Sequence, residues 1–317
     1  IIVAVSAKDK NEMDALPLAS VHWVADALAL ADNLDVDVVV ELVGGAEGIA
    51  KKLVEASLKN GKPVVTANKA LLAHHGLALA EMAETSGATL AFEAAVGGGI
   101  PIIKAMRESL SANRFTRVMG ILNGTCNYIL TEMQQRQCNF DDALKEAQAK
   151  GYAEADPSFD IDGIDTAHKI TILASLAFGC VPDVKQVAAQ GIRNITLKNM
   201  EAAASQGYRI KLLGIALLKN GHITQRVQPC LVSESSPFFH VQGVVNGIVV
   251  EGDPIGAVFF EGRGAGAEAT ASAVVADLMD IACGVKYKPF TWPAAELILL
   301  PPAETPPQAS LKTLEDV

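Results

Sequence analysis

The first third of the chain alternates short apolar segments with longer segments of helical periodicity, and this alternation constrains the fold more than any other feature. Val36–Leu42, for example, is a largely apolar run of the kind found inside parallel sheets. Strands that are separated by helices in this way form a parallel sheet with helices on both faces. We therefore predict an α/β fold with a Rossmann-like, doubly wound parallel sheet. The predicted strands are 1–5, 36–42, 62–66 and 88–93, and the predicted helices are 21–31, 44–59 and 71–86.

From Phe115 onward the alternation changes, which indicates a second domain of α+β type with a mostly antiparallel sheet. Its predicted strands are 117–121, 211–218, 223–232, 243–252 and 257–260. We expect a nucleotide-binding domain at 1–112 and a substrate-binding, catalytic and dimerisation domain at 113–264. A helix within 265–300 then returns to the first domain, and 301–317 forms a loosely held tail.

The charge balance argues for a small-molecule substrate. A net charge of -10 disfavours nucleic acid and anionic membranes as partners, because both need clustered Lys and Arg. The five cysteines show no CxxC spacing, so neither a disulfide framework nor a zinc site is indicated, and the cytoplasm is the simplest location. No signal peptide is recognisable, and the longest nearly apolar run, 170–181, is far shorter than the ~20 residues that span a bilayer.

Ligands on parallel sheets bind beyond the carboxyl ends of the strands, and three turns of the chain are expected there. Ser6 and Lys8 follow the first strand and suit the 2′-phosphate of NADP better than an acidic residue would. Gly44 and Gly45 let the backbone approach a phosphate, although helix-entry glycines are common without a ligand. Lys69 begins a helix, where a cation opposes the helix dipole, so it is either a solvated surface lysine or a functional one.

The glycine loop that normally cradles a dinucleotide is not found near the start of the chain. No GxGxxG fingerprint precedes Ile1, and the first visible strand resembles the second strand of such a domain. We therefore expect the first strand and its loop to be missing from this sequence. A later cluster contains Gly264 and Gly266, but no βαβ unit continues after it. Its glycines indicate either a backbone that approaches the cofactor or close helix packing.

The segment Gly151–Lys169 concentrates negative charge and ends in a lysine. It holds five carboxylates, Glu154, Asp156, Asp160, Asp162 and Asp165, and no arginine or lysine before Lys169. Their mutual repulsion calls for a cationic ligand or a counter-charge from another segment.

A helix is predicted over 163–178, with Asp162 as its N-cap and with Asp165 and Lys169 on one stripe. Because this helix is apolar almost all round, Lys169 should be partly desolvated, which would lower its pKa toward the value that proton transfer near pH 7 requires. The alternative is an ordinary capping box with an i,i+4 ion pair.

Two further glycine turns are candidate ligand sites. The turn Glu93–Ile100 ends a strand with three glycines, and its exposed carbonyls could hold a cation, although a simple tight turn has the same pattern. The turn Gly120–Tyr128 offers backbone N–H groups and the Thr125 hydroxyl before a helix. An anion such as a substrate carboxylate would fit there.

Taken together, five separated blocks resemble homoserine dehydrogenase, and the resemblance runs from Val36 to about Ala282. The blocks are VVTANKALLA from Val64, EAAVGGGIPII from Glu93, GILNGTCNYIL from Gly120, GYAEADPSFDIDGIDTAHK from Gly151, and the late GRGAG. The resemblance implies NADH- or NADPH-dependent, reversible reduction of aspartate semialdehyde to homoserine.

The resemblance also implies roles for individual residues. Lys169 and Lys69 match the two lysines proposed for proton transfer, and Asp165 matches an active-site carboxylate. Glu154 matches the position that holds the substrate ammonium, and we expect Asp160 to assist it. Gly124 and Thr125 match the turn near the substrate, and carbonyl oxygens match the ligands of a bound Na+ or K+. These carbonyls belong to Glu93, Val96, Gly98 and Ile100.

A homodimer formed through the antiparallel sheet, or a homotetramer, is the implied assembly. Other readings stay open. One is a dehydrogenase of another amino-acid semialdehyde, another is a phosphorylating aldehyde dehydrogenase with Cys126 as its nucleophile, and a third is a non-enzymatic metabolite sensor on the same scaffold. The sequence leaves cofactor preference, feedback regulation and the presence of a fused kinase or regulatory domain open.

Overall fold

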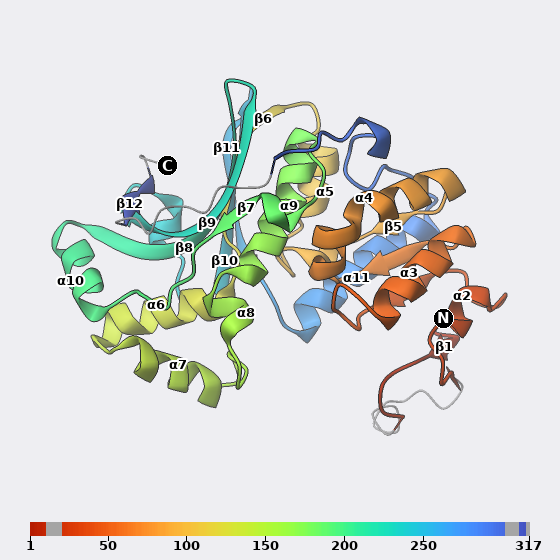
Figure 1. Ribbon diagram of the computed structural model, residues 1–317, viewed down its shortest axis with the longest axis horizontal. Helices are drawn as coiled ribbons and strands as arrows, with labels where there is room; N and C mark the ends of the chain where they lie inside the picture. The colour runs from red at the N-terminus through yellow and green to blue at the C-terminus, as the bar shows by residue number, and fades with distance from the viewer. Residues whose placement is uncertain (11–20, 302–310, 315–317) are drawn as a thin grey trace.

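The computed structural model describes residues 1–10, 21–301 and 311–314, and it contains two main sheets (Figure 1). The first is parallel, with the strand order β3-β4-β5. A separate parallel pair, β1-β2, lies beside the N-terminus. The elements of this half are β1 (Ala4–Val5), β2 (His22–Trp23), α2 (Ala29–Asp32), β3 (Val39–Glu41), α3 (Ile49–Lys59), β4 (Val64–Thr66), α4 (Lys69–Ser86) and β5 (Leu90–Ala91).

Side-chain alternation explains why the first sheet is covered on both faces. Val64 of β4 and Leu90 of β5 face the main core with helices α3 and α4. Their neighbours Val65 and Ala91 point the other way and pack with Val274 of α11 (Ala267–Ala282). All of these side chains are buried, as expected for a doubly wound sheet. The predicted Rossmann-like parallel sheet is therefore confirmed.

The second sheet is larger and mostly antiparallel, which confirms the predicted α+β part. Its strand order is β11-β10-β6-β8-β9-β12, with β7 also on β9; only β7 and β12 pair in parallel. The strands are β6 (Arg114–Ile121), β7 (Val187–Ala189), β8 (Tyr208–Lys219), β9 (His222–Ser233), β10 (Val245–Asp253), β11 (Gly256–Arg263) and β12 (Lys312–Thr313).

Helix α9 (Ile164–Phe178) joins the two halves. It contacts β6, β8 and β9 on one side and helix α4 on the other, and nearly all of its residues are buried. The remaining elements are η1 (Glu93–Ala95), α5 (Ile102–Lys104), the π-helical turn η2 (Ala105–Ser109), α6 (Gly124–Arg136), α7 (Phe140–Ala149), α8 (Ser158–Ile161), η3 (Val184–Gln186), α10 (Leu197–Ser205), η4 (Pro237–His240) and η5 (Ala294–Glu296).

Three local predictions were wrong. The predicted helix 21–31 is a strand at His22–Trp23 followed by a short helix at Ala29–Asp32. Helix α3 begins only at Ile49, so Gly44 and Gly45 belong to the preceding loop. Asp162 does not cap α9, because it ends the short helix α8.

Gly163 takes the N-cap position of α9 instead, with φ +83°, a conformation that favours glycine. The carboxylate of Asp162 pairs with Arg193. Within the parts of the chain described, no helix is long and apolar enough to cross a membrane.

Candidate active site

Two lysines and one buried aspartate meet where helices α4 and α9 come together. The Nζ atom of Lys169 lies 2.7 Å from Asp165 Oδ2 and donates to the Leu122 carbonyl at 2.7 Å. The Nζ atom of Lys69, at the start of α4, lies 3.2 Å from Asp165 Oδ1. The two lysines predicted to be catalytic therefore contact the same predicted carboxylate, although the three residues come from two distant segments.

Electrostatics keep Asp165 ionised. Burial alone would raise the pKa of this carboxyl group, but the ammonium groups of Lys169 and Lys69 and the hydrogen bonds it accepts outweigh burial and lower the pKa to about 2. The Asp165 side chain is 4% exposed, the Lys169 side chain 10% and the Lys69 side chain 35%. Only Lys69 is therefore substantially open to solvent.

The sequence interpretation missed Asn123, which organises the acidic groups. Its Nδ2 atom donates to Asp165 Oδ2 at 2.8 Å and to Asp160 Oδ1 at 2.7 Å. Its Oδ1 atom accepts from Cys126 N at 2.8 Å and caps helix α6. The available signal was an asparagine immediately before a helix start, because asparagine is a preferred N-cap residue.

Asp160 is the second carboxylate of the cluster. Burial, together with the nearby charge of Asp165, raises its pKa, and the hydrogen bond from Asn123 opposes this rise. Among the described residues, no lysine or arginine forms an ion pair with the half-buried Asp160 carboxyl group. A cationic ligand would supply the missing counter-charge.

The other predicted substrate-binding residues are Thr125, Gly124 and Glu154. The Thr125 hydroxyl donates to the Tyr152 carbonyl at 2.7 Å. A Cβ atom on Gly124 would lie 2.8 Å from the Val244 carbonyl oxygen, so this turn requires glycine. Glu154 is exposed, and within the described residues its side chain makes no contact with Asp165 or the lysines.

The loop after β3 is held by a second buried carboxylate, Glu41. Its Oε1 atom accepts from the N–H groups of Val43 and Gly44, and its Oε2 atom accepts from Thr66 Oγ1. Asn68 Nδ2 donates to the Gly45 carbonyl at 2.8 Å and so ties this loop to the start of α4. Because Glu41 uses the Gly44 N–H, that group is not free for a phosphate.

Other residues predicted to contact the cofactor are scattered. Ser6 is half-buried and Lys8 exposed in the segment after β1, and no hydrogen bond or ion pair among the described residues joins either of them to the Asp165 cluster. Gly264 packs against a different loop, because a Cβ atom on Gly98 would lie 2.7 Å from its backbone. Gly266 has φ +110° and caps α11. Gly264 thus lies close to another loop, and the approach of this cluster to the cofactor stays a prediction.

The loop predicted to bind a monovalent cation is buried and strongly held. The Glu93 carboxylate accepts from Ile103 N at 2.9 Å and Lys104 N at 2.8 Å, and burial raises its pKa to about 7. The Ile100 carbonyl accepts from Ile102 N at 2.7 Å. The carbonyls of Val96 and Gly98 accept no hydrogen bond in the described structure. The carbonyl oxygens of Val96 and Gly98 therefore have free lone pairs, and the bound cation stays a prediction.

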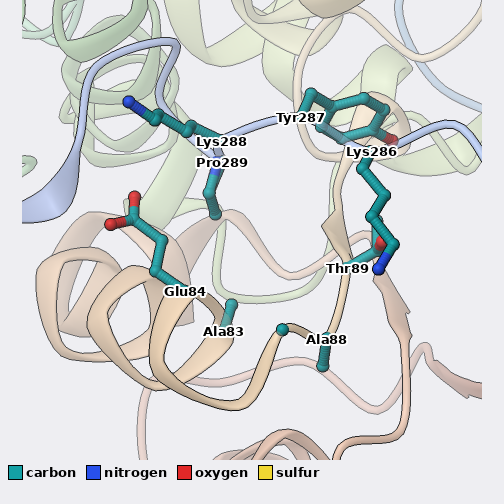
Figure 2. A pocket seen from close by; sticks show the side chains of 9 residues that line it. Ala83, Glu84, Ala88, Thr89, Lys286, Tyr287, Lys288 and Pro289 are labelled. Atoms are coloured by element: carbon teal, nitrogen blue, oxygen red, sulfur yellow. The ribbon is translucent and has the colours of Figure 1, made fainter.

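A pocket of about 270 Å³ lies elsewhere, between the end of α4 and the segment 286–289. Figure 2 shows Ala83 and Glu84 on one side of it and Tyr287 and Thr89 on the other. It lies at the amino end of β5, whereas parallel sheets bind their ligands at the carboxyl ends. The pocket is therefore separate from the candidate active site.

Two family models match consecutive parts of the chain. One, described as homoserine dehydrogenase, matches residues 101–279, and the other, described as homoserine dehydrogenase, NAD binding domain, matches residues 1–93. The chain is 50% identical to a homoserine dehydrogenase of Pseudomonas aeruginosa over 81% of its own length and 59% of that protein. It is 38% identical to that of Bacillus subtilis over 98% of its length and 72% of that protein.

Solved structures agree with these matches. A homoserine dehydrogenase from Thiobacillus denitrificans matches with a TM-score of 0.89 and 44% identity over 94% of this chain and 71% of that one. A hyperthermophilic archaeal homoserine dehydrogenase in complex with NADPH matches with a TM-score of 0.75 and 28% identity over 88% of this chain and 81% of that one. The chain spans about six tenths of the length of the Pseudomonas relative. By sequence and by structure, the chain belongs to the homoserine dehydrogenase family.

Proposed function

We propose that the chain catalyses the reversible, NAD(P)H-dependent reduction of L-aspartate 4-semialdehyde to L-homoserine. The observation that carries this proposal is the contact of Lys169 and Lys69 with the buried Asp165, next to an acidic segment. The nicotinamide supplies the hydride when it is bound. The protein must then orient the aldehyde and deliver a proton to the oxygen that becomes an alkoxide.

Each residue of the cluster has a task in this scheme. Lys169 donates the proton, and Asp165 holds its ammonium group in place. Lys69, the more exposed lysine, binds the cofactor or relays the proton. Asp160, with Glu154 at the rim, attracts the ammonium group of the substrate, and the Gly124–Thr125 turn receives its carboxylate.

The remaining assignments belong to the same proposal. Ser6, Lys8, Gly44, Gly45, Gly264 and Gly266 are proposed to lie along the cofactor, and the first two would favour NADP. We propose Na+ or K+ at the Glu93–Ile100 loop, a homodimer or homotetramer, a cytoplasmic location, and the domain limits given above. Support comes from the family membership and, for the cofactor, from the archaeal relative in complex with NADPH.

The test is oxidation of NADPH or NADH, followed by absorbance, after addition of aspartate semialdehyde. Replacing Lys169 by Ala should lower turnover by about two to four orders of magnitude, with little change in cofactor affinity, because a positioned proton donor contributes that much. The matched control is Lys185→Ala, since Lys185 is an exposed lysine outside the cluster. Near-normal turnover of Lys169→Ala would reject the assigned role.

A further inference from the structure

An aromatic side chain covers Lys69. Phe159, on the short helix α8, is 41% exposed, which is unusual for a large apolar side chain beside a buried ion cluster. The centre of its ring lies 5.8 Å from Lys69 Nζ. This separation is within the range of about 6 Å over which an ammonium group is attracted to the face of an aromatic ring.

Two histidine rings pack next to the Phe159 ring, His168 directly and His74 through His168. His168, next to Lys169 on α9, meets Phe159 edge to face at 5.4 Å between ring centres. On its other side His168 meets His74 of α4 in the same manner at 5.2 Å. Two consecutive edge-to-face contacts therefore join the three rings across α8, α9 and α4, and such contacts are favourable at these distances.

The charge state of His168 suits this arrangement. Burial, and to a lesser degree the neighbouring His74, lowers the pKa of His168 to about 4, so its imidazole is neutral near pH 7. A neutral ring adds no repulsion toward Lys69 and Lys169. Its buried Nδ1 atom has no hydrogen-bond partner among the described residues, so packing rather than hydrogen bonding holds it there.

We propose that Phe159 is a positioning residue, which holds the Lys69 ammonium group against Asp165, and that His168 fixes the Phe159 ring in that place. The catalytic part of this inference rests on the proposed function. A lysine side chain has four rotatable bonds, and the salt bridge to Asp165 leaves the Lys69 side chain 35% exposed. The ring supplies a second attraction that restricts the ammonium group to one position.

The test uses fluorinated phenylalanines at position 159, with one, two or three fluorine atoms. Fluorine removes electron density from the ring face but hardly changes its shape, so a packing role alone would not respond. The attraction of a partly exposed cation to a ring corresponds to about a two- to fivefold effect. We expect kcat/KM for the semialdehyde to fall stepwise with each fluorine, by that factor over the series, and Phe159→Trp to retain the wild-type value.

A second readout does not depend on turnover. The rate at which trinitrobenzenesulfonate modifies Lys69, measured by peptide mass spectrometry, should rise about two- to fivefold over the same series. Lys51, which pairs with Glu47 on the surface, is the internal reference within each sample. The matched control is fluorination of Phe239, whose ring stacks on Arg209 at 4.1 Å outside the cluster, and which should change neither readout.

The outcomes separate this inference from the proposed function. A wild-type protein without semialdehyde reduction would defeat the proposed function, while the modification rates of Lys69 would still decide whether Phe159 holds its ammonium group. If those rates stay constant across the fluorinated series, the inference is overturned. If they rise while kcat/KM stays constant, the ring holds Lys69 but does not position it for the reaction, and the proposal is rejected in that form.

Discussion

Replacing Asp165 by Asn should destabilise the fold and abolish most activity, because this single carboxylate forms ion pairs with two ammonium groups. Its ordinary pKa is 3.8 and its folded value is about 2. At about 1.36 kcal/mol per pKa unit, this difference corresponds to roughly 2 to 3 kcal/mol of folding free energy. The variant also leaves the Lys169 ammonium group buried without a negatively charged partner, so the total loss should be about 3 to 5 kcal/mol.

The sign of the pH dependence follows from the lowered pKa. The stabilisation by Asp165 is present above its unfolded pKa of about 4 and is lost as the pH falls toward the folded value of about 2. Urea unfolding at pH 7 should therefore show the full difference between wild type and variant, and unfolding at pH 5 should show nearly the same difference.

A double variant sharpens the test. Lys169→Met replaces the lysine of the Lys169–Asp165 pair by an uncharged side chain of similar volume. The double variant Asp165→Asn/Lys169→Met should therefore be more stable than Asp165→Asn alone. Two results would show that the two charges do not depend on each other in the fold. One is a loss of unfolding free energy in the double variant that equals the sum of the losses in the single variants, and the other is a loss below about 0.5 kcal/mol for Asp165→Asn. The reasoning would then be refuted.

Three further variants probe the surroundings of the cluster. Asn123→Ala removes an N-cap and the donor between two carboxylates, so the unfolding free energy should fall by about 1 to 3 kcal/mol and the KM for the semialdehyde should rise; an unchanged KM would contradict its organising role. Gly124→Ala places a methyl group against the Val244 carbonyl oxygen and should cost about 1 to 3 kcal/mol in urea unfolding, whereas wild-type stability would mean that the turn can relax. Glu93 has a raised pKa, so its contribution to stability is lost as the pH rises from about 4.5 to about 7, and the Tm of Glu93→Gln should decline less than that of wild type over this interval; parallel declines would argue against titration of Glu93.

Much of the fold follows from patterns that depend only on neighbouring residues. The apolar run at 36–42 predicts a strand because a buried parallel strand needs apolar groups on both faces, and β3 lies within it. Lys169 is buried as predicted because helix α9 is apolar on nearly every side. Short segments were less predictable. His22–Trp23 is a strand because it pairs with Ala4–Val5, and a distant partner of this kind leaves no periodic signal in two residues.

The amino-acid sequence alone determined the two sheet types, the buried helix with its lysine, and the acidic segment beside it. Only the tertiary structure decided which charges meet. Lys69 reaches Asp165 across almost a hundred residues because α4 packs on α9, and Asn123 joins two carboxylates because the turn before α6 ends next to them. Periodicity reports which face of an element is apolar, but the partner of that face is chosen by packing between distant segments, and the contacts of a site arise from that choice.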